Sequence, residues 1–121
     1  MGNYLQEPIK EKETQDFENE YIRAGSSLMQ GWRRTMEDCL AMGKDVKPGV
    51  SAFAVFDGHG GREIAKFCSV HFIEFLKKSE AFEKGDYEEA LKETYEMLDD
   101  AIYNGAYDSE IETYYMKPMG Q

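Results

Sequence analysis

The sequence has few of the features that mark a secreted or membrane-spanning chain. It contains two cysteines, Cys39 and Cys68, in 121 residues, well below the density of a disulfide-stapled extracellular domain. No apolar run approaches the roughly 20 residues needed to span a bilayer, and the N-terminus lacks the apolar core of a signal peptide. We therefore expect reduced thiols and a cytoplasmic or nuclear protein without a transmembrane segment.

Positively charged residues are also outnumbered: 14 Lys and Arg stand against 24 Asp and Glu, which gives a formal net charge of -10. A field of this sign repels nucleic acid and anionic lipid, so we expect no nucleic-acid partner. The acids gather toward the two ends of the chain, whereas residues 21–78 hold nine bases against six acids. A local basic site in this middle segment can therefore still bind one phosphate group.

The amino-acid composition fits a protein with a single globular core. The chain is 41% hydrophobic, 31% charged and 13% aromatic, which is enough apolar material for a buried interior. Residues 7–20 are polar and show no apolar period, which indicates a surface arm. We divide the chain into an N-terminal arm, residues 1–20, and a folded part, residues 21–121.

Three segments have the composition of strands. The first, Tyr21–Gln30, is predicted to end at a turn formed by Gly31-Trp32. The second, Met36–Met42, is closed by a glycine and followed by the turn signal Asp45–Gly49. The third, Val50–Phe56, is almost entirely apolar and bounded by turn residues, so we predict a strand that is buried on both faces.

Beyond the third strand the pattern changes to that of helices. Apolar residues at helical spacing predict a helix over Glu63–Lys78. Asp86, with Glu89 three residues later, predicts the N-cap of a second helix that ends at Asn104-Gly105. The remaining residues show no strong period. The apolar face of the second helix is predicted to include Tyr87, Leu91, Tyr95, Leu98 and Ile102.

The segment Asp57–Gly61, with sequence DGHGG, lies where the third strand gives way to the first helix. A carboxylate there is a hard oxygen ligand suited to Mg²⁺ or Mn²⁺, and the glycines let a backbone carbonyl approach an ion. An ordinary turn capped by Asp57 is the alternative. His59, in this loop, can supply a proton to a leaving alcohol. His71 instead falls on the apolar face of the first helix and is predicted to be a core-edge residue.

A second group of charges, Arg33–Asp38, holds two bases and two acids within six residues. An arginine can bind a phosphate dianion through paired hydrogen bonds, and the acids can serve a second metal ion or orient its waters. Alone this is a common solvated cluster. Together with the Asp57 loop it predicts a combined anion and metal site.

The segments Ser26–Arg33, Met36–Asp38 and Phe53–Gly61, in this order, resemble the first signature segments of the type 2C metal-dependent protein serine/threonine phosphatases. The opening Met1–Leu5 resembles the N-terminus of the eukaryotic branch. The resemblance implies an α+β fold, a four-layer αββα sandwich in which a central antiparallel β-sandwich is flanked by helix pairs. We expect this chain to supply only part of it.

The resemblance also implies a pair of Mg²⁺ or Mn²⁺ ions in the complete domain. By position, Asp57 would bridge both ions, the Gly58 carbonyl would bind one, and Glu37 would serve the other, with Asp38 in a supporting role. A water activated by the two metals would then hydrolyse phosphoserine or phosphothreonine in phosphoprotein substrates.

Two further roles follow from the resemblance. Arg33 would bind the substrate phosphate, and His59 would be the general acid. Family members take further aspartate ligands from downstream strands, and this chain ends at Gln121, so we expect the chain alone to be inactive. The alternative is a truncated, noncatalytic module that acts by protein binding. The complete domain is expected to be a monomer, and Met1-Gly2 is a weak match to an N-myristoylation signal.

Overall fold

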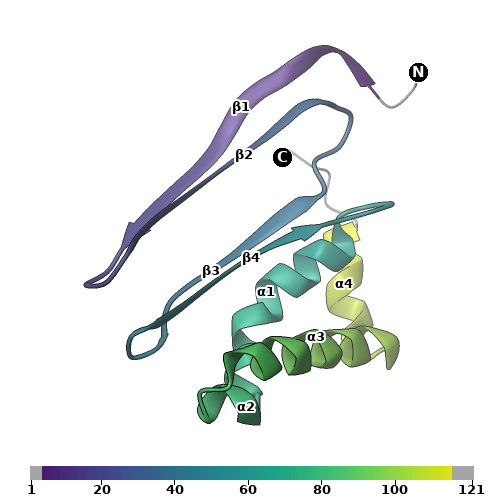
Figure 1. Cartoon of the computed structure of the whole chain (residues 1–121). Coiled ribbons are helices and arrows are strands. Elements are labelled where there is room, and N and C mark those ends of the chain that lie inside the picture. The colour runs from purple at the N-terminus through teal and green to yellow at the C-terminus, as the bar shows by residue number, and fades with distance from the viewer. Residues whose placement is uncertain (1–3, 116–121) are drawn as a thin grey trace. The chain divides into compact units, whose positions relative to one another are not determined.

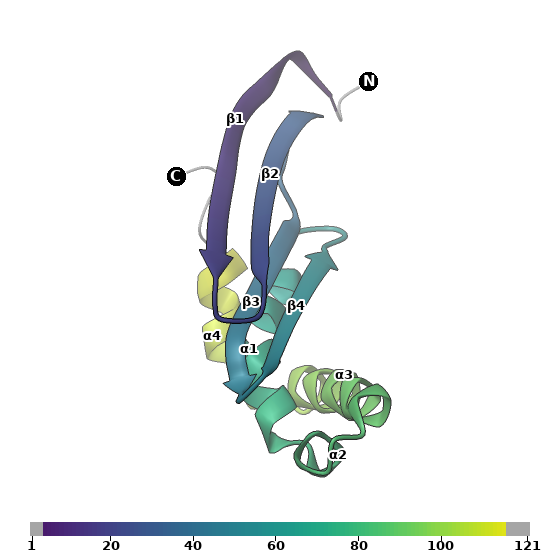
Figure 2. The ribbon, with the colours of Figure 1, turned by 60° about the vertical axis from the view of Figure 1, so that its left-hand side comes forward.

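The computed structural model describes residues 4–115, which divide into two compact units, one up to Met36 and one from Glu37 onward. Figures 1 and 2 show two strand pairs followed by a group of helices. The predicted arm and domain boundaries, 1–20 and 21–121, stay a prediction, and the acylation signal at Met1-Gly2 lies outside the described residues.

The first unit is a hairpin of two long strands. Strand β1 (Tyr4–Glu18) pairs antiparallel with β2 (Arg23–Arg33). At its tip the side chain of Asn19 accepts hydrogen bonds from the backbone N–H groups of Tyr21 and Ile22. Residues 7–20 are largely exposed, as expected of an arm, but residues 7–18 form part of a strand because backbone pairing with β2 does not require an apolar period.

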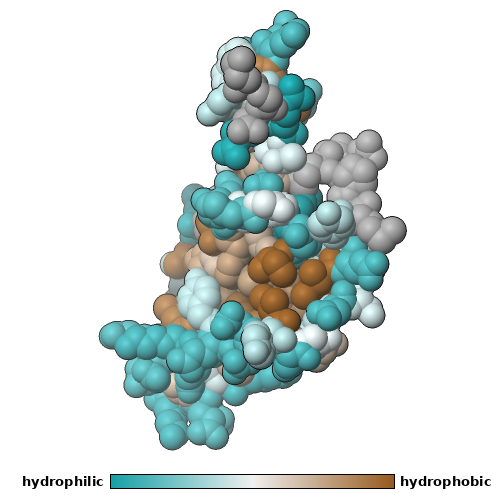
Figure 3. Space-filling model, turned by 90° about the vertical axis from the view of Figure 1, so that its right-hand side faces the viewer, coloured by the Kyte–Doolittle hydropathy of each residue, from teal (hydrophilic) through white to brown (hydrophobic). Residues whose placement is uncertain are grey.

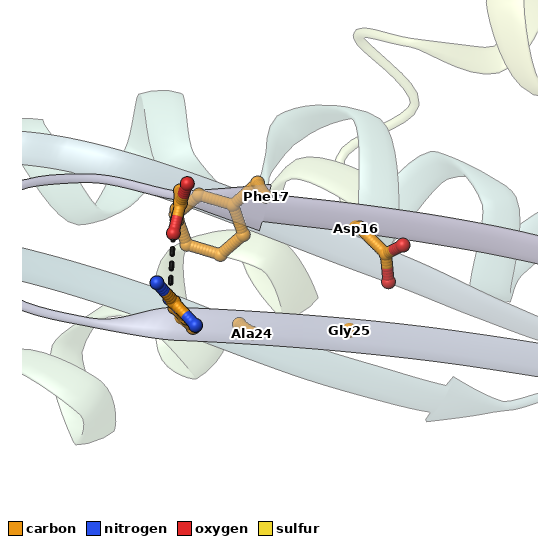
Figure 4. A pocket seen from close by; sticks show the side chains of 6 residues that line it. Asp16, Phe17, Ala24 and Gly25 are labelled. Atoms are coloured by element: carbon orange, nitrogen blue, oxygen red, sulfur yellow. Dashed lines mark ion pairs between the residues drawn. The ribbon is translucent and has the colours of Figure 1, made fainter.

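A pocket lies at the tip end of this hairpin (Figure 4). Two of its lining residues, Glu18 and Arg23, form an ion pair 2.7 Å long, and both side chains are largely exposed. A surface pair of this kind adds little stability. The pocket is lined by Asp16, Phe17, Glu18, Arg23, Ala24 and Gly25.

The predicted turn at Gly31-Trp32 is wrong, because β2 continues through both residues to Arg33. Gly31 has a φ of +68° and pairs with Ile9, next to shifts in the strand register on both sides of Ile9. Glycine adopts this backbone conformation without steric cost, so the strand absorbs it as an irregularity.

The second unit begins with a shorter hairpin. Strand β3 (Asp38–Lys47) extends beyond the predicted closing glycine and pairs antiparallel with β4 (Val50–Asp57), which matches the predicted third strand. The prediction that β4 is buried on both faces is wrong, since Phe53 is 46% and Val55 65% exposed. Helix α1 covers one face of the hairpin, and these two side chains belong to the other.

Helix α1 (Glu63–Lys78) has the predicted bounds, and its Phe67 and Phe72 are fully buried in the core. Helix α2 (Glu80–Glu83) is a single turn capped by Ser79, whose hydroxyl accepts a hydrogen bond from the Phe82 N–H at 3.2 Å. This short helix has no sequence period of its own and was not predicted.

Helix α3 (Tyr87–Tyr103) begins at the predicted cap, where the Asp86 carboxylate accepts a hydrogen bond from the Glu89 N–H at 3.3 Å, and it ends as predicted at Asn104. Helix α4 (Asp108–Tyr115) was not predicted. In Figure 1, α3 crosses beside α1, and α4 also lies against α1. None of the helices in the described part of the chain is long and apolar enough to cross a bilayer.

The predicted apolar face of α3 is only partly correct. Leu98 is buried and Ile102 partly buried, but Tyr87, Leu91 and Tyr95 are 42–53% exposed. The buried face carries small residues, which allow α3 to approach α1 closely. The buried residues of α3 are Ala90, Thr94, Leu98 and Ala101. Figure 3 shows hydrophobic side chains gathered near the middle of one view of the molecule, with hydrophilic ones around them.

Candidate metal and phosphate site

The acidic residues of the candidate site lie at one end of the β3–β4 hairpin. Asp38, the first residue of β3, pairs in register with Asp57, the last residue of β4. Directly opposed residues of an antiparallel pair point to the same face. Both are exposed, so the hairpin places two carboxylates side by side at the edge of the sheet.

Glu37 precedes β3 and fixes the loop that follows β4. Its backbone carbonyl accepts a hydrogen bond from the Gly58 N–H at 3.0 Å, and its Oε1 accepts one from the Gly61 N–H at 2.8 Å. One residue therefore holds both ends of the glycine loop. The sequence predicts a metal role for Glu37, but this bracing joins residues 24 positions apart and no local pattern predicts it.

Two positions of the loop require glycine, Gly58 because backbone atoms leave no space for a Cβ and Gly61 because of its backbone conformation. A Cβ on Gly58 would lie 2.7 Å from the Glu37 carbonyl oxygen and 2.8 Å from the Gly61 carbonyl oxygen. Gly61 has a φ of +131°, which L-residues rarely adopt, and the Glu63 carboxylate occupies the place of its missing Cβ. The backbone oxygens thus converge closely around Gly58.

His59 is exposed on this loop, and its Nδ1 lies 3.2 Å from the carbonyl oxygen of Asp57. When Nδ1–H donates to that carbonyl, Nε2 is left facing solvent. The imidazole is therefore oriented by the same residue whose carboxylate ends β4. This arrangement suits proton exchange with a molecule bound beside the loop.

The donor chemistry of this loop fits a hard divalent cation. Asp57 and Glu37 supply carboxylate oxygens and Gly58 a backbone carbonyl, the ligand types that Mg²⁺ and Mn²⁺ prefer. Within the described residues no group of three or more His, Cys, Asp or Glu side chains comes together to hold a metal. The ligands fit in kind, but they are fewer than the roughly six oxygens that such an ion needs.

Arg33 is the last residue of β2, and its side chain is exposed. The side-chain amide of Gln30 donates a 2.8 Å hydrogen bond to the Arg33 carbonyl, which fixes the backbone at this end of the strand. Arg33 belongs to the first compact unit, whereas Glu37, Asp57 and Gly58 belong to the second. Its role as the phosphate ligand stays a prediction.

His71 is buried on α1, as predicted for a core-edge residue. Its partners, which were not predicted, are the carboxylates of Glu74 and Glu110. The i, i+3 spacing of His71 and Glu74 on one helix is a signal that can be found in sequence. The contact to Glu110 could not have been found in this way, because α4 itself was not predicted.

Comparison with known proteins identifies relatives over most of the chain. The family model described as Protein phosphatase 2C matches residues 22–114. "Probable protein phosphatase 2C 2" of Paramecium tetraurelia is 44% identical over 114 residues, which cover 94% of this chain and 38% of the relative. "Probable protein phosphatase 2C 21" of Arabidopsis thaliana is 44% identical over 102 residues, which cover 84% of this chain and 29% of the relative. The chain thus spans less than two fifths of the length of these relatives.

Proposed function

Because this chain belongs to the protein phosphatase 2C family, we propose that it supplies part of the site of a metal-dependent protein serine/threonine phosphatase. The observation that carries the proposal is the bracing of the Gly58–Gly61 loop by Glu37, directly after the carboxylate of Asp57. This bracing fixes oxygen donors at the end of a strand before any ion binds, and preorganised donors bind ions and charged transition states more strongly.

In this proposal, Asp57, the Gly58 carbonyl and Glu37 would hold two Mg²⁺ or Mn²⁺ ions, with Asp38 in support. When bound, the ions would lower the pKa of a water molecule that attacks phosphorus. Glu37 also braces Gly61, so its Oε1 is engaged and its other oxygen is available to an ion or its waters. Further ligands would come from other parts of the complete domain.

Two residues would act on the substrate. Arg33 would bind the phosphate dianion with paired hydrogen bonds, which its exposed guanidinium allows. His59 would donate a proton to the serine or threonine oxygen as the phosphorus–oxygen bond breaks. Its contact with the Asp57 carbonyl supports this role, because it leaves Nε2 toward solvent.

We further propose that the complete domain is an αββα sandwich. The outer apolar face of the β3–β4 hairpin supports this idea; it consists of Leu40, Met42, Phe53 and Val55, which pair in register as Leu40 with Val55 and Met42 with Phe53. An exposed apolar sheet face of this kind is suited to packing against a second sheet. The same face also favours the second candidate function, a noncatalytic module that binds a protein partner.

The test of the proposed function is phosphate release from a phosphoserine or phosphothreonine peptide by the complete natural polypeptide that carries this sequence. We expect turnover with Mn²⁺ or Mg²⁺ and none after chelation. Arg33→Ala should raise KM more than it lowers kcat, whereas the matched control Arg34→Ala, its exposed neighbour, should change little. Metal-independent turnover, or equal effects of the two arginine variants, would contradict the proposal.

A further inference from the structure

His71 is the buried centre of a set of polar contacts that joins α1 to α4. Its Nδ1 lies 2.9 Å from Glu74 Oε1, and its Nε2 lies 2.7 Å from Glu110 Oε2. A carboxylate can only accept hydrogen bonds, so both ring nitrogens must donate for both contacts to form. Only the protonated imidazolium carries two N–H groups. The geometry therefore fits the charged form of His71.

Aromatic rings surround the imidazole. The ring centroid of His71 lies 4.6 Å from that of Phe67, 5.6 Å from that of Phe75 and 5.1 Å from that of Tyr107. These rings cover the imidazole, whose side chain is 11% exposed, whereas the side chains of Glu74 and Glu110 are 47% and 34% exposed. A charge in such surroundings is stable only when it is paired, and the two carboxylates provide the pairing.

The charged groups around His71 come from two helices. On α1, Glu74 also accepts a 3.2 Å hydrogen bond from Lys78. On α4, Glu110 Oε2 also accepts a 2.8 Å hydrogen bond from the hydroxyl of Tyr114. Helix α3 also packs on α1. Its residue Asp99 contributes to raising the pKa of Cys68 on α1 and is not among the causes of the pKa shift of His71.

The pKa shifts agree with the geometry. Burial acts to lower the pKa of His71, but the hydrogen bonds and charges of Glu74 and Glu110 outweigh it and raise the pKa above the usual 6.5. The His71 hydrogen bond lowers the pKa of Glu74. Burial and the contact with Glu110 raise the pKa of Tyr114 to about 12, so its hydroxyl stays a neutral donor near neutral pH.

Helix α4 has little else to hold it. It is eight residues long and has no fully buried residue. Ile111 and Tyr114 are partly buried hydrophobic residues that pack at the edge of the core. Isolated helices of this length are unstable in water. Its docking on α1 therefore depends strongly on the contact between Glu110 and His71.

We propose that His71 is a proton-dependent latch, which docks α4 on α1 while the imidazole is protonated and releases it when the proton is lost. Deprotonation removes one N–H, so one carboxylate then faces a ring nitrogen lone pair instead of a donor. A group whose pKa is raised in the folded state stabilises it fully below the unfolded pKa. That contribution is lost as the pH rises through the folded pKa. The latch does not depend on the proposed phosphatase activity.

Hydrogen–deuterium exchange of the α4 amides, measured against pH in the complete natural polypeptide and corrected for intrinsic exchange, tests this proposal. We expect protection at Ile111–Tyr115 to fall by about tenfold or more as His71 titrates, while α3 keeps its protection. The NMR signal of the His71 ring, assigned by its loss in His71→Gln, gives the titration itself. Glu110→Gln should lower α4 protection at pH 6 and remove its pH dependence.

The matched control is Glu112→Gln, which makes the same change of charge on an exposed position of α4. It should keep the wild-type profile. The latch is excluded if His71 titrates below pH 6.5, if α4 protection stays constant through the titration, or if Glu112→Gln has the same effect as Glu110→Gln. Should Glu110→Gln fail to fold, the wild-type titration and exchange profile decide alone.

Discussion

The Glu37 carboxylate accepts a 2.8 Å hydrogen bond from the backbone N–H of Gly61, across 24 positions of sequence. Through this contact the residue before β3 fixes the conformation of the loop after β4. The acid therefore has a structural role that exists without metal, in addition to the metal role proposed for it. These two roles can be separated by experiment.

The variants Glu37→Gln and Glu37→Ala separate the structural role of Glu37 from its proposed metal role. Glutamine keeps a side-chain oxygen that can accept from Gly61, whereas alanine keeps none. We expect Glu37→Ala to lower the free energy of unfolding by about 1–3 kcal/mol, the usual cost of losing a partly buried hydrogen bond to a charged group, and Glu37→Gln to lower it much less. Both should weaken Mn²⁺ binding. Urea unfolding without metal and calorimetric Mn²⁺ titration measure the two effects; equal stability of both variants would exclude the bracing role.

Gly58→Ala tests the close approach of backbone oxygens in the loop. Its Cβ would lie 2.7 Å from the Glu37 carbonyl oxygen, so the loop must shift. We expect a destabilisation of about 1–3 kcal/mol, typical of overpacking, measured by thermal unfolding. The control is Gly60→Ala, at a φ of +72° with nothing within 4 Å of the added atom. This control should cost only the backbone strain, about 1–2 kcal/mol, and leave the Glu37 contacts intact. Gly60→Ala should therefore lose less Mn²⁺ affinity than Gly58→Ala, and a larger loss in Gly60→Ala than in Gly58→Ala would contradict the close approach at Gly58.

The outer apolar face predicts poor solution behaviour of the isolated 121-residue chain. Phe53 and Val55 are large, exposed and adjacent to Leu40 and Met42, and such a face promotes association. We expect partly folded or aggregated material, and less association in the double variant Phe53→Thr/Val55→Thr. Light scattering and size-exclusion chromatography measure this. A monodisperse, cooperatively unfolding wild-type monomer would contradict the prediction.

His59 should matter only when the leaving group needs a proton. In the complete natural polypeptide, His59→Asn should reduce kcat on a phosphoserine peptide by about 10²–10⁴-fold, the usual contribution of a general acid. On an aryl phosphate, whose leaving group is stable as an anion, it should have little effect. Comparison of kcat for the two substrates measures the difference, and an equal loss on both would assign His59 a role other than proton donation.

Local signals made α1 and the start of α3 predictable. The bounds of α1 follow from an apolar period, and the Asp86 cap follows from a side chain that bonds three residues ahead. Part of the buried face of α3 could not be predicted, because Ala90 and Thr94 are small, and close helix packing rather than side-chain size selects them. Strand β1 and helix α4 depend on partners elsewhere in the chain, so no local pattern reveals them.

In the candidate site too, the local features could be predicted from sequence and the long-range contacts could not. Its residue types, spacing and position at the end of β4 could be identified from sequence, and in the structure Asp57 ends β4 while Gly58 and His59 follow it. The contacts of Glu37 with Gly58 and Gly61 were not predicted, because they depend on how the hairpin closes in space. The metal and phosphate roles of these residues stay predictions.

The metal role of Asp57 is tested by phosphate release from Asp57→Asn, compared with the wild type in the complete natural polypeptide at saturating Mn²⁺. Asparagine keeps the shape of the side chain but removes the charge that would bridge the two ions. Asp100→Asn, an exposed acid on α3, is the matched control. We expect Asp57→Asn to abolish turnover while the control keeps it; full activity of Asp57→Asn would exclude a metal-bridging role for Asp57.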